Sequence, residues 1–159
     1  MTVSALSTVM ITAGPLSIAE LLGVVAGAPV ELAADARRRI AASRAIVEAA
    51  LHGEELIYGL NTGLGHLRNE RIPDHMLGAY QDAIIAAHVG GIGPALPVAV
   101  VRAAMAVRLN GICRGGSGAS EAVADMLAVL LNAGVHPIVP TIGSVGAADL
   151  MHMAAIGEG

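Results

Sequence analysis

The sequence predicts an all-α protein. Hydrophobic residues make up 55% of the 159 residues and charged residues only 14%, a balance that excludes a disordered, charge-rich chain. The chain has two tyrosines but no phenylalanine or tryptophan, so its core must be aliphatic. Alanine-rich apolar sequence favours closely packed helices, because alanine has the highest helix propensity.

Two helices are expected in the first third of the chain. Ser17 and Glu20 form a capping box, which predicts a short helix running to about Ala26. Residues 33–51 carry apolar side chains at helical spacing with charges between them, and Gly53 lies just after them. We therefore expect a second helix over residues 33–51.

A glycine-rich loop and a third helix come next. Residues 56–65 contain three glycines with Asn and Thr between them, which does not suit a helix. Residues 73–88 are predicted to be helical, with Pro73 at an acceptable first position. Residues 89–94 contain three glycines and a proline and break that helix.

The second half of the chain predicts three more helices. Residues 96–109 are apolar on nearly every side, as in a buried helix, and a further helix is expected over 119–132 with its end at Gly134. Residues 136–140 are expected to be extended, because each proline disfavours helix in the residue before it. A last helix is predicted from about Ala147, and short strand-like pieces are expected near Ile57 and Val139.

The composition excludes several classes of function. The net charge is −4 and all nine basic residues are arginines, which cluster only at residues 37–39, so nucleic-acid binding is not expected. Charged residues and glycines interrupt the apolar stretches too often for a membrane protein. One cysteine, Cys113, cannot form an internal disulfide, and no basic region precedes Arg37, so a cytoplasmic location is expected. The low charge also indicates a surface covered by other subunits or by the rest of a longer chain.

Four stretches carry candidate functional residues, and each has an ordinary structural interpretation. The loop around Tyr58 could be a plain connection, since it lacks the strand and the Lys-Ser/Thr ending of a phosphate-binding loop. His88 could be a core histidine, Arg108 and Asn110 polar groups at a helix end, and residues 143–146 a simple turn.

The four stretches together point to a family. They are Tyr-Gly-Leu-Asn-Thr-Gly-Leu-Gly from Tyr58, Ala-His-Val-Gly-Gly-Ile-Gly-Pro from Ala87, Val-Arg-Leu-Asn-Gly from Val107 with the Gly-Ser-Gly turn ending at Gly118, and His-Pro-Ile-Val-Pro-Thr-Ile-Gly-Ser-Val-Gly-Ala from His136. In this order and spacing the sequence resembles the aromatic amino-acid ammonia-lyases (histidine, phenylalanine and tyrosine ammonia-lyase-like), from about Leu16 to Gly159. The resemblance implies the N-terminal portion of the helical fold of the fumarase/aspartase-like superfamily.

The resemblance also implies a chemistry and a set of site residues. Members are carbon–nitrogen lyases that remove a weakly acidic β-proton from an α-amino acid and expel the amine. Tyr58 matches the general base, and its flexible glycine loop would let it close over the substrate and exclude water. Tyr58 and Gly65 are the candidate catalytic residues. Asn61 and His88 match substrate-binding positions, and an imidazole at His88 suits an imidazole or phenol ring better than a bare phenyl ring. No metal is expected.

The segment that builds the family's electrophile is altered. Most members form a methylidene-imidazolone from Ala-Ser-Gly, whereas this chain has Ala147, Ala148 and Asp149 before Leu150. Cyclisation requires a serine that loses its hydroxyl and a glycine whose nitrogen attacks, and Ala148-Asp149 supplies neither. Ser144 lies outside the triad. We therefore expect this cofactor not to form.

The chain also ends where family members continue. We expect residues 1–159 to be a single N-terminal lyase-like domain, completed by a second lyase-like chain or by a missing C-terminal region that carries the carboxylate-binding and acidic residues. The expected assembly is a homo- or hetero-oligomer that acts on a small amino-acid-like substrate.

Two functions are compatible with the altered electrophile segment and with the shorter chain. The first is a subunit or fragment of a carbon–nitrogen lyase that needs no electrophile because its leaving group is already activated, as in the trimethylammonium of a histidine betaine. The alternative is a non-catalytic lyase-like paralogue acting as a binding or assembly partner. Retention of Tyr58 and its glycine loop favours the enzyme, and the four ordered motifs argue against a plain helical interaction module.

Overall fold

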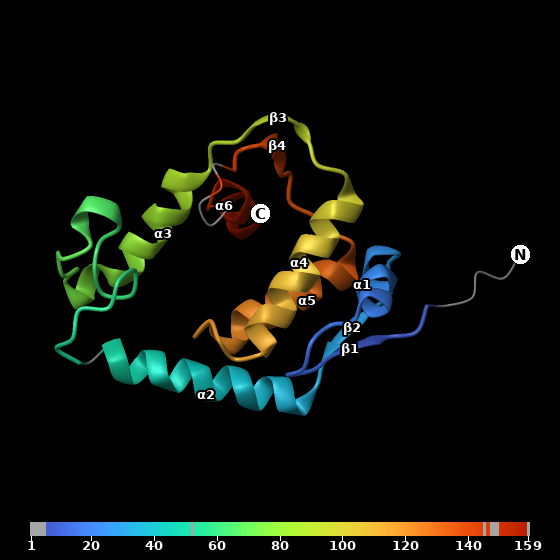
Figure 1. Ribbon diagram of the computed structural model, residues 1–159, viewed down its shortest axis with the longest axis horizontal. Coiled ribbons are helices and arrows are strands. Elements are labelled where there is room, and N and C mark those ends of the chain that lie inside the picture. Colours follow the sequence, from blue (N-terminus) through green and yellow to red (C-terminus); the bar gives the residue numbers. More distant parts are fainter. Residues whose placement is uncertain (1–5, 52, 145, 147–149, 159) are drawn as a thin grey trace, which may run out of the picture. The chain divides into compact units, whose positions relative to one another are not determined.

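The computed structural model describes residues 6–51, 53–144, 146 and 150–158. Within these ranges the chain forms six α-helices, two short 3₁₀ helices and four short strands, which confirms the all-α prediction (Figure 1). The chain divides into two compact units. One combines Met1–Ile46 with Ala95–Ile138, and the other combines Val47–Pro94 with Val139–Gly159.

The first unit is a helical unit with one small sheet. Its elements are β1 (Val9–Ile11), α1 (Ile18–Val25), β2 (Val30–Leu32), the first part of α2 (Ala34–Leu51), α4 (Val98–Cys113) and α5 (Glu121–Ala133). The capping box at α1 is present as predicted: Glu20 N–H donates to Ser17 Oγ, and Ser17 N–H donates to a Glu20 carboxylate oxygen. The αL conformation of Gly134, with φ 69°, ends α5 where the sequence predicted.

The parallel pairing of β1 and β2 was not predicted. Val9, Met10 and Ile11 pair with Val30, Glu31 and Leu32, with α1 as the crossover between the strands. The other edge of β2 is paired with a side chain, because Asn132 Oδ1 accepts from Val30 N–H at 2.8 Å and Asn132 Nδ2 donates to Val30 C=O at 3.0 Å. The side-chain amide of Asn132 therefore makes the hydrogen bonds to Val30 that a third strand would make at this edge.

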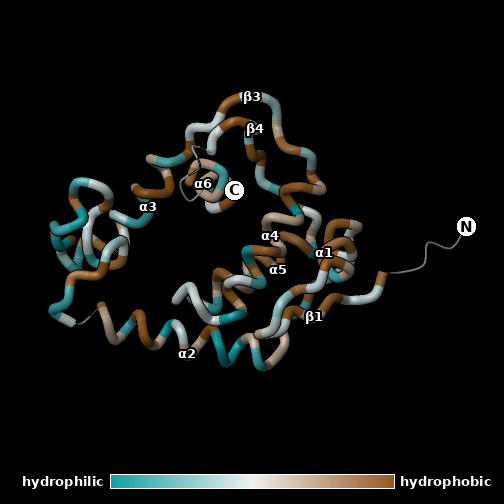
Figure 2. The backbone as a smooth tube through the Cα atoms, in the orientation of Figure 1, coloured by the Kyte–Doolittle hydropathy of each residue, from teal (hydrophilic) through white to brown (hydrophobic). Residues whose placement is uncertain are grey.

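The buried residues of this unit surround α4, which packs against α1 and α5. Met105, Ala106, Leu109 and Cys113 of α4 are fully buried. Other members of the core are Ile11, Val24, Val30, Ala36, Ile40, Ala124 and Leu131. Figure 2 shows hydrophobic residues along most of α1, which packs on α4.

Two buried polar side chains of α4 bind backbone groups of its neighbours. Asn110 donates to Gly14 C=O and accepts from Leu16 N–H, so it fixes the chain just before α1. Arg102 donates to Val24 C=O, near the end of α1, and to Leu131 C=O, near the end of α5. Cations are favoured at helix C-termini, where carbonyl groups lack helical partners. Asn110 and Arg102 therefore stabilise the fold. For Asn110 this agrees with its structural interpretation as a polar group at a helix end.

Among the described residues, the second unit contains the glycine-rich loop and six elements that follow it. It comprises the 3₁₀ helices η1 (Gly65–Leu67) and η2 (Asp74–Met76), then α3 (Leu77–His88), β3 (Ile92–Ala95), β4 (Pro140–Ile142) and α6 (Leu150–Glu158). Strands β3 and β4 pair, and α3 packs on α6. Glycine allows β4 to approach closely, because a Cβ on Gly91 would lie 2.9 Å from Pro140 and one on Gly93 would lie 2.7 Å from Thr141.

Several predicted boundaries need correction. The strand-like piece near Val139 is β4, but the one near Ile57 is wrong, because Ile57 C=O accepts from Leu60 and Asn61 N–H and so heads a turn. The helix predicted from Pro73 begins as the 3₁₀ helix η2 and becomes α-helical at Leu77. In the described chain the last helix begins at Leu150, and its predicted start at Ala147 lies outside the described residues.

The two units differ in how many of their large side chains are buried. The largest fully buried side chains lie mostly in the first unit, and Asn61 and Thr62 are those that the described part of the second unit contributes. Exposed apolar side chains of the second unit include Leu56, Met76, Ile85, Ile92, Ile142 and Leu150. None of the described helices combines the length and the apolar character that crossing a bilayer requires.

Candidate active site

The predicted loop around Tyr58 is a closed turn held by its own polar groups. Asn61 Oδ1 accepts from Ile57 N–H at 2.8 Å, and Asn61 Nδ2 donates to Glu55 C=O at 2.8 Å. Thr62 Oγ1 accepts from Gly59 N–H at 3.2 Å. Gly59 has a φ of 73°, in the left-handed region that favours glycine. The loop is therefore ordered by its Asn-Thr-Gly sequence.

Asn61 lies at the centre of this loop. It is completely buried, and both ends of its amide group bond the backbone of residues 55–57. These bonds give Asn61 a structural role in shaping the loop. Its predicted role in substrate binding stays a prediction.

Tyr58 and Gly65, the two predicted catalytic residues, are brought together. Tyr58 is 63% exposed, and its hydroxyl oxygen accepts a hydrogen bond from Gly65 N–H at 3.3 Å. Gly65 has a φ of 59°, in the left-handed region that favours glycine. No atom lies within 4 Å of a Cβ built there, so the backbone conformation, and not a lack of space, is the reason for glycine at this position. A backbone N–H aimed at a phenol oxygen stabilises negative charge on that oxygen.

Two residues of α3 that the sequence interpretation missed also bind this loop. The hydroxyl of Tyr80 accepts from Leu64 N–H at 3.2 Å, and Gln81 Nε2 donates to Gly59 C=O at 3.4 Å. The only available signal was composition, because Tyr58 and Tyr80 are the two tyrosines of the chain. Their meeting at one turn could not be inferred from a separation of 22 residues.

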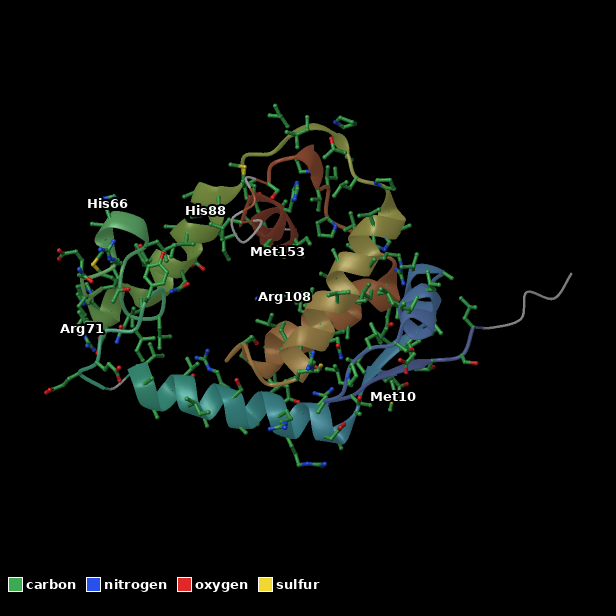
Figure 3. The ribbon with its side chains drawn as sticks, in the orientation of Figure 1. Met10, His66, Arg71, His88, Arg108 and Met153 are labelled. Atoms are coloured by element: carbon green, nitrogen blue, oxygen red, sulfur yellow. The ribbon has the colours of Figure 1, made fainter. Side chains whose placement is uncertain are left out.

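Arg71 closes the base of the loop. Its guanidinium donates to the carbonyls of Gly53 and Glu54 at 3.1 and 3.4 Å, and it lies 3.8 Å from an Asp74 carboxylate oxygen. Thr62 and Arg71 also form an isolated antiparallel bridge. Figure 3 marks Arg71 and His66 in this part of the chain, with His88 farther along on α3. Arg71 thus holds together the two ends of the segment that carries Tyr58.

His88, the predicted substrate-ring residue, lines a pocket at the end of α3. The pocket has a volume of about 190 Å³ and is lined by Ile84, Ile85, His88, Leu150, Met153, Ala154 and Gly157 of α3 and α6. His88 Nδ1 lies 2.7 Å from Ile84 C=O, so Nδ1 donates and Nε2 is the ring nitrogen left to accept a hydrogen bond in the neutral form. Among the described residues that line this pocket, His88 has the single polar side chain.

The electrophile-equivalent residues Ala147, Ala148 and Asp149 lie outside the described residues. Before them, the Ser144 hydroxyl accepts from Gly146 N–H at 3.1 Å, which forms a small turn. After them, His152 of α6 has a buried Nε2 that lies 3.2 Å from a Cβ built on Gly143. The triad offers no serine hydroxyl to eliminate, so the residues present do not fit a methylidene-imidazolone. Within the described chain, no three His, Cys, Asp or Glu residues gather as metal ligands would.

The sequence of this chain is similar to those of known lyases. Residues 16–159 match the sequence profile of the family described as aromatic amino acid lyase. The chain belongs to this family. It is 45% identical over 138 residues to a probable histidine ammonia-lyase of Halobacterium salinarum, and 43% identical over 160 residues to the histidine ammonia-lyase of Sorangium cellulosum.

A solved structure agrees with the lyase fold. Ergothionase from Treponema denticola, an ergothioneine-degrading enzyme crystallised with desmethyl-ergothioneine sulfonic acid, superposes with a TM-score of 0.91 over 95% of this chain at 28% identity. The matches cover 83% and 94% of this chain for the two sequence relatives, but only 26% and 31% of the relatives' own length. For ergothionase the share is likewise 31%. The chain thus spans about a quarter to a third of these lyases.

Proposed function

We propose that this chain is the Tyr58-bearing part of a carbon–nitrogen lyase that eliminates a tertiary amine from the quaternary ammonium group of an imidazole α-amino acid betaine, without a methylidene-imidazolone. The observation that carries the proposal is the contact between the Tyr58 hydroxyl and Gly65 N–H. The chain has this contact although its Ala147-Ala148-Asp149 segment contains no serine. A catalytic base without an electrophile fits a substrate whose leaving group is already activated.

Tyr58 supplies the proton chemistry in this proposal. As a phenolate it takes a proton from the β-carbon of the substrate, the electron pair of that C–H bond forms the Cα–Cβ double bond, and the Cα–N bond breaks. Trimethylamine leaves as a neutral molecule because the quaternary nitrogen takes the bonding pair. The products are an α,β-unsaturated acid and the amine. Gly65 N–H stabilises the phenolate oxygen before the proton moves.

His88 supplies recognition of the substrate ring. Its Nε2 is free to accept a hydrogen bond, while its Nδ1 is fixed on Ile84 C=O, so the imidazole is held in one orientation. The surrounding side chains of the α3–α6 pocket are apolar and suit the faces of a flat ring. An imidazole N–H of the substrate would complete the hydrogen bond.

The likeness to ergothionase supports the betaine class of substrate. Ergothioneine is a histidine betaine that carries a trimethylammonium group, and the structural match with the enzyme that degrades it covers nearly the whole chain. The histidine ammonia-lyase relatives support the imidazole ring in the same way.

We further propose that a second lyase-like chain or the remainder of a longer polypeptide completes the active site. The exposed apolar side chains of the second unit and the 26–31% coverage of the relatives support this. The buried free thiol of Cys113 fits a reducing, cytoplasmic environment.

A substrate comparison tests the proposal. The completed enzyme is incubated with histidine, histidine betaine and ergothioneine, and ammonia and trimethylamine are measured separately. We expect trimethylamine from a betaine and no ammonia from histidine. Ammonia release from histidine at a rate equal to or above the betaine reaction would contradict the proposal.

A further inference from the structure

The two tyrosines of the chain bind consecutive amides of one turn. Leu64 N–H donates to the Tyr80 hydroxyl at 3.2 Å, and Gly65 N–H donates to the Tyr58 hydroxyl at 3.3 Å. Leu64 is extended, with φ −104° and ψ 157°, so its own N–H and that of Gly65 point to opposite sides of the chain. Leu64 is therefore held between the two phenols.

The two tyrosines differ in how firmly they are anchored. Tyr58 is on the loop and is 63% exposed, whereas Tyr80 is half-buried in α3, the helix that also carries His88. Gln81, next to Tyr80, donates to the C=O of Gly59, the residue directly after Tyr58. The loop is thus fastened to α3 at two points, Gly59 and Leu64, which both follow Tyr58 in the sequence.

We propose that Tyr80 is a positioning residue for the reaction: by binding Leu64 N–H from α3, it orients the Leu64–Gly65 segment so that Gly65 N–H meets the Tyr58 hydroxyl. The inference rests on the proposed function in that Tyr58 is taken as the base. In this proposal Tyr80 acts through the Leu64 amide, and not directly on the substrate or the reacting atoms. Its hydroxyl, rather than its ring, carries the effect, because the hydroxyl oxygen is the acceptor.

Amide hydrogen exchange of the intact protein tests the coupling without any substrate. In Tyr80→Phe, both Leu64 N–H and Gly65 N–H should exchange about fivefold faster, the effect of losing one ordinary hydrogen bond at each site. In the matched control Tyr58→Phe, Gly65 N–H should exchange faster while Leu64 N–H keeps its protection. This asymmetry distinguishes a positioning residue from two independent contacts.

Two outcomes would overturn the inference. One is Tyr80→Phe accelerating Leu64 alone and leaving Gly65 unchanged. The other is an equal acceleration at the buried Leu109 amide of α4, which would indicate general loosening of the protein. Hydrogen exchange can reveal either outcome whether or not the enzyme acts on a betaine.

Kinetics of the completed enzyme provide the second arm. Tyr80→Phe should lower kcat about tenfold with little change in KM, because misorientation of the base affects the chemical step. Added to Tyr58→Phe, it should cause no further loss. An additive loss in the double variant would contradict the positioning role. If Tyr58→Phe itself leaves the rate unchanged while the exchange coupling holds, then the proposed function fails and the positioning of this turn stands.

Discussion

At the residue scale, the hydroxyl group of Tyr58 is the atom on which the proposed chemistry depends. Replacing Tyr58 with Phe removes only this hydroxyl and its bond from Gly65 N–H. We expect turnover to fall by about 10²–10⁴-fold, as for loss of a general base. The melting temperature should barely change, because the side chain is 63% exposed. Activity of the completed enzyme and thermal unfolding of the variant are the two measurements.

The opposite pattern would remove Tyr58 from the mechanism. A tyrosine that only supports the fold would lose stability when cut to Phe and would leave the rate of the folded protein intact. That result would also remove the main argument against a non-catalytic paralogue, since the retained loop would then have no chemical purpose.

Residue types pointed to part of this site but not to its contacts. The Tyr-Gly-Leu-Asn-Thr-Gly-Leu-Gly run indicated Tyr58 and Gly65, and the structure places them in contact. The role of Tyr80 depends on a hydrogen bond across 16 residues to Leu64, which no local pattern encodes. Asn61 stays a predicted substrate-binding residue, and its buried amide also binds the backbone of its own loop, which the sequence did not indicate.

At the scale of elements, α4 should provide most of the stability of the first unit. Leu109 is fully buried on α4, whereas Val107, two residues earlier, is 55% exposed. Leu109→Ala should lower the free energy of unfolding by about 2–5 kcal/mol, because it removes apolar burial and leaves a cavity. Val107→Ala is the matched control, with an expected change within about 0.5 kcal/mol. Equal effects of the two substitutions in chemical denaturation would show that α4 is not the centre of the core.

A partly buried contact between Arg102 and His136, near the ends of α1 and α5, predicts sensitivity to acid. Arg102 Nη1 lies 2.9 Å from His136 Nε2, so the imidazole is the acceptor and must be neutral there. Burial, and secondly the charge of Arg102, lower the pKa of His136 below its usual 6.5. The unfolded chain therefore binds the proton more readily than the folded one. Stability is full above about pH 6.5 and falls as the pH drops below it.

Thermal unfolding between pH 5 and 8 measures this effect. The melting temperature should decline on the acid side, and His136→Gln, which cannot titrate, should flatten the decline. A wild-type decline that persists unchanged in His136→Gln would assign the acid sensitivity to other groups.

The helices were predictable because each carried a local signal. The capping box at Ser17, the αL glycine at Gly134 and the apolar spacing of residues 33–51 all lie within a few turns of the helix they define. Strands β1 and β2 have three residues each, too few for an alternating pattern, and they form through pairing across about 20 residues. The Asn132 cap on β2 spans 102 residues, so only the folded chain reveals it.

At the scale of the whole molecule, the exposed apolar surface predicts association. Large hydrophobic side chains are exposed on several helices, among them Val100 of α4, Met126 and Val129 of α5, and Ile85 of α3. Soluble monomers seldom expose contiguous apolar patches of large area. The purified chain should therefore form an oligomer or aggregate in light scattering, and a complementary lyase chain should restore solubility. A monodisperse monomer with a single cooperative unfolding transition would contradict this.

The central claim is that this member of the aromatic amino acid lyase family works without the methylidene-imidazolone. Forming that group from three residues eliminates two waters, so the mass of the intact protein reports it directly. We predict that the chain, purified under non-denaturing conditions and then measured intact, has the mass calculated from its 159 residues, with no loss of water. A mass lower by two waters, mapped by peptide analysis to residues 146–149, would show that the electrophile forms and would contradict the account.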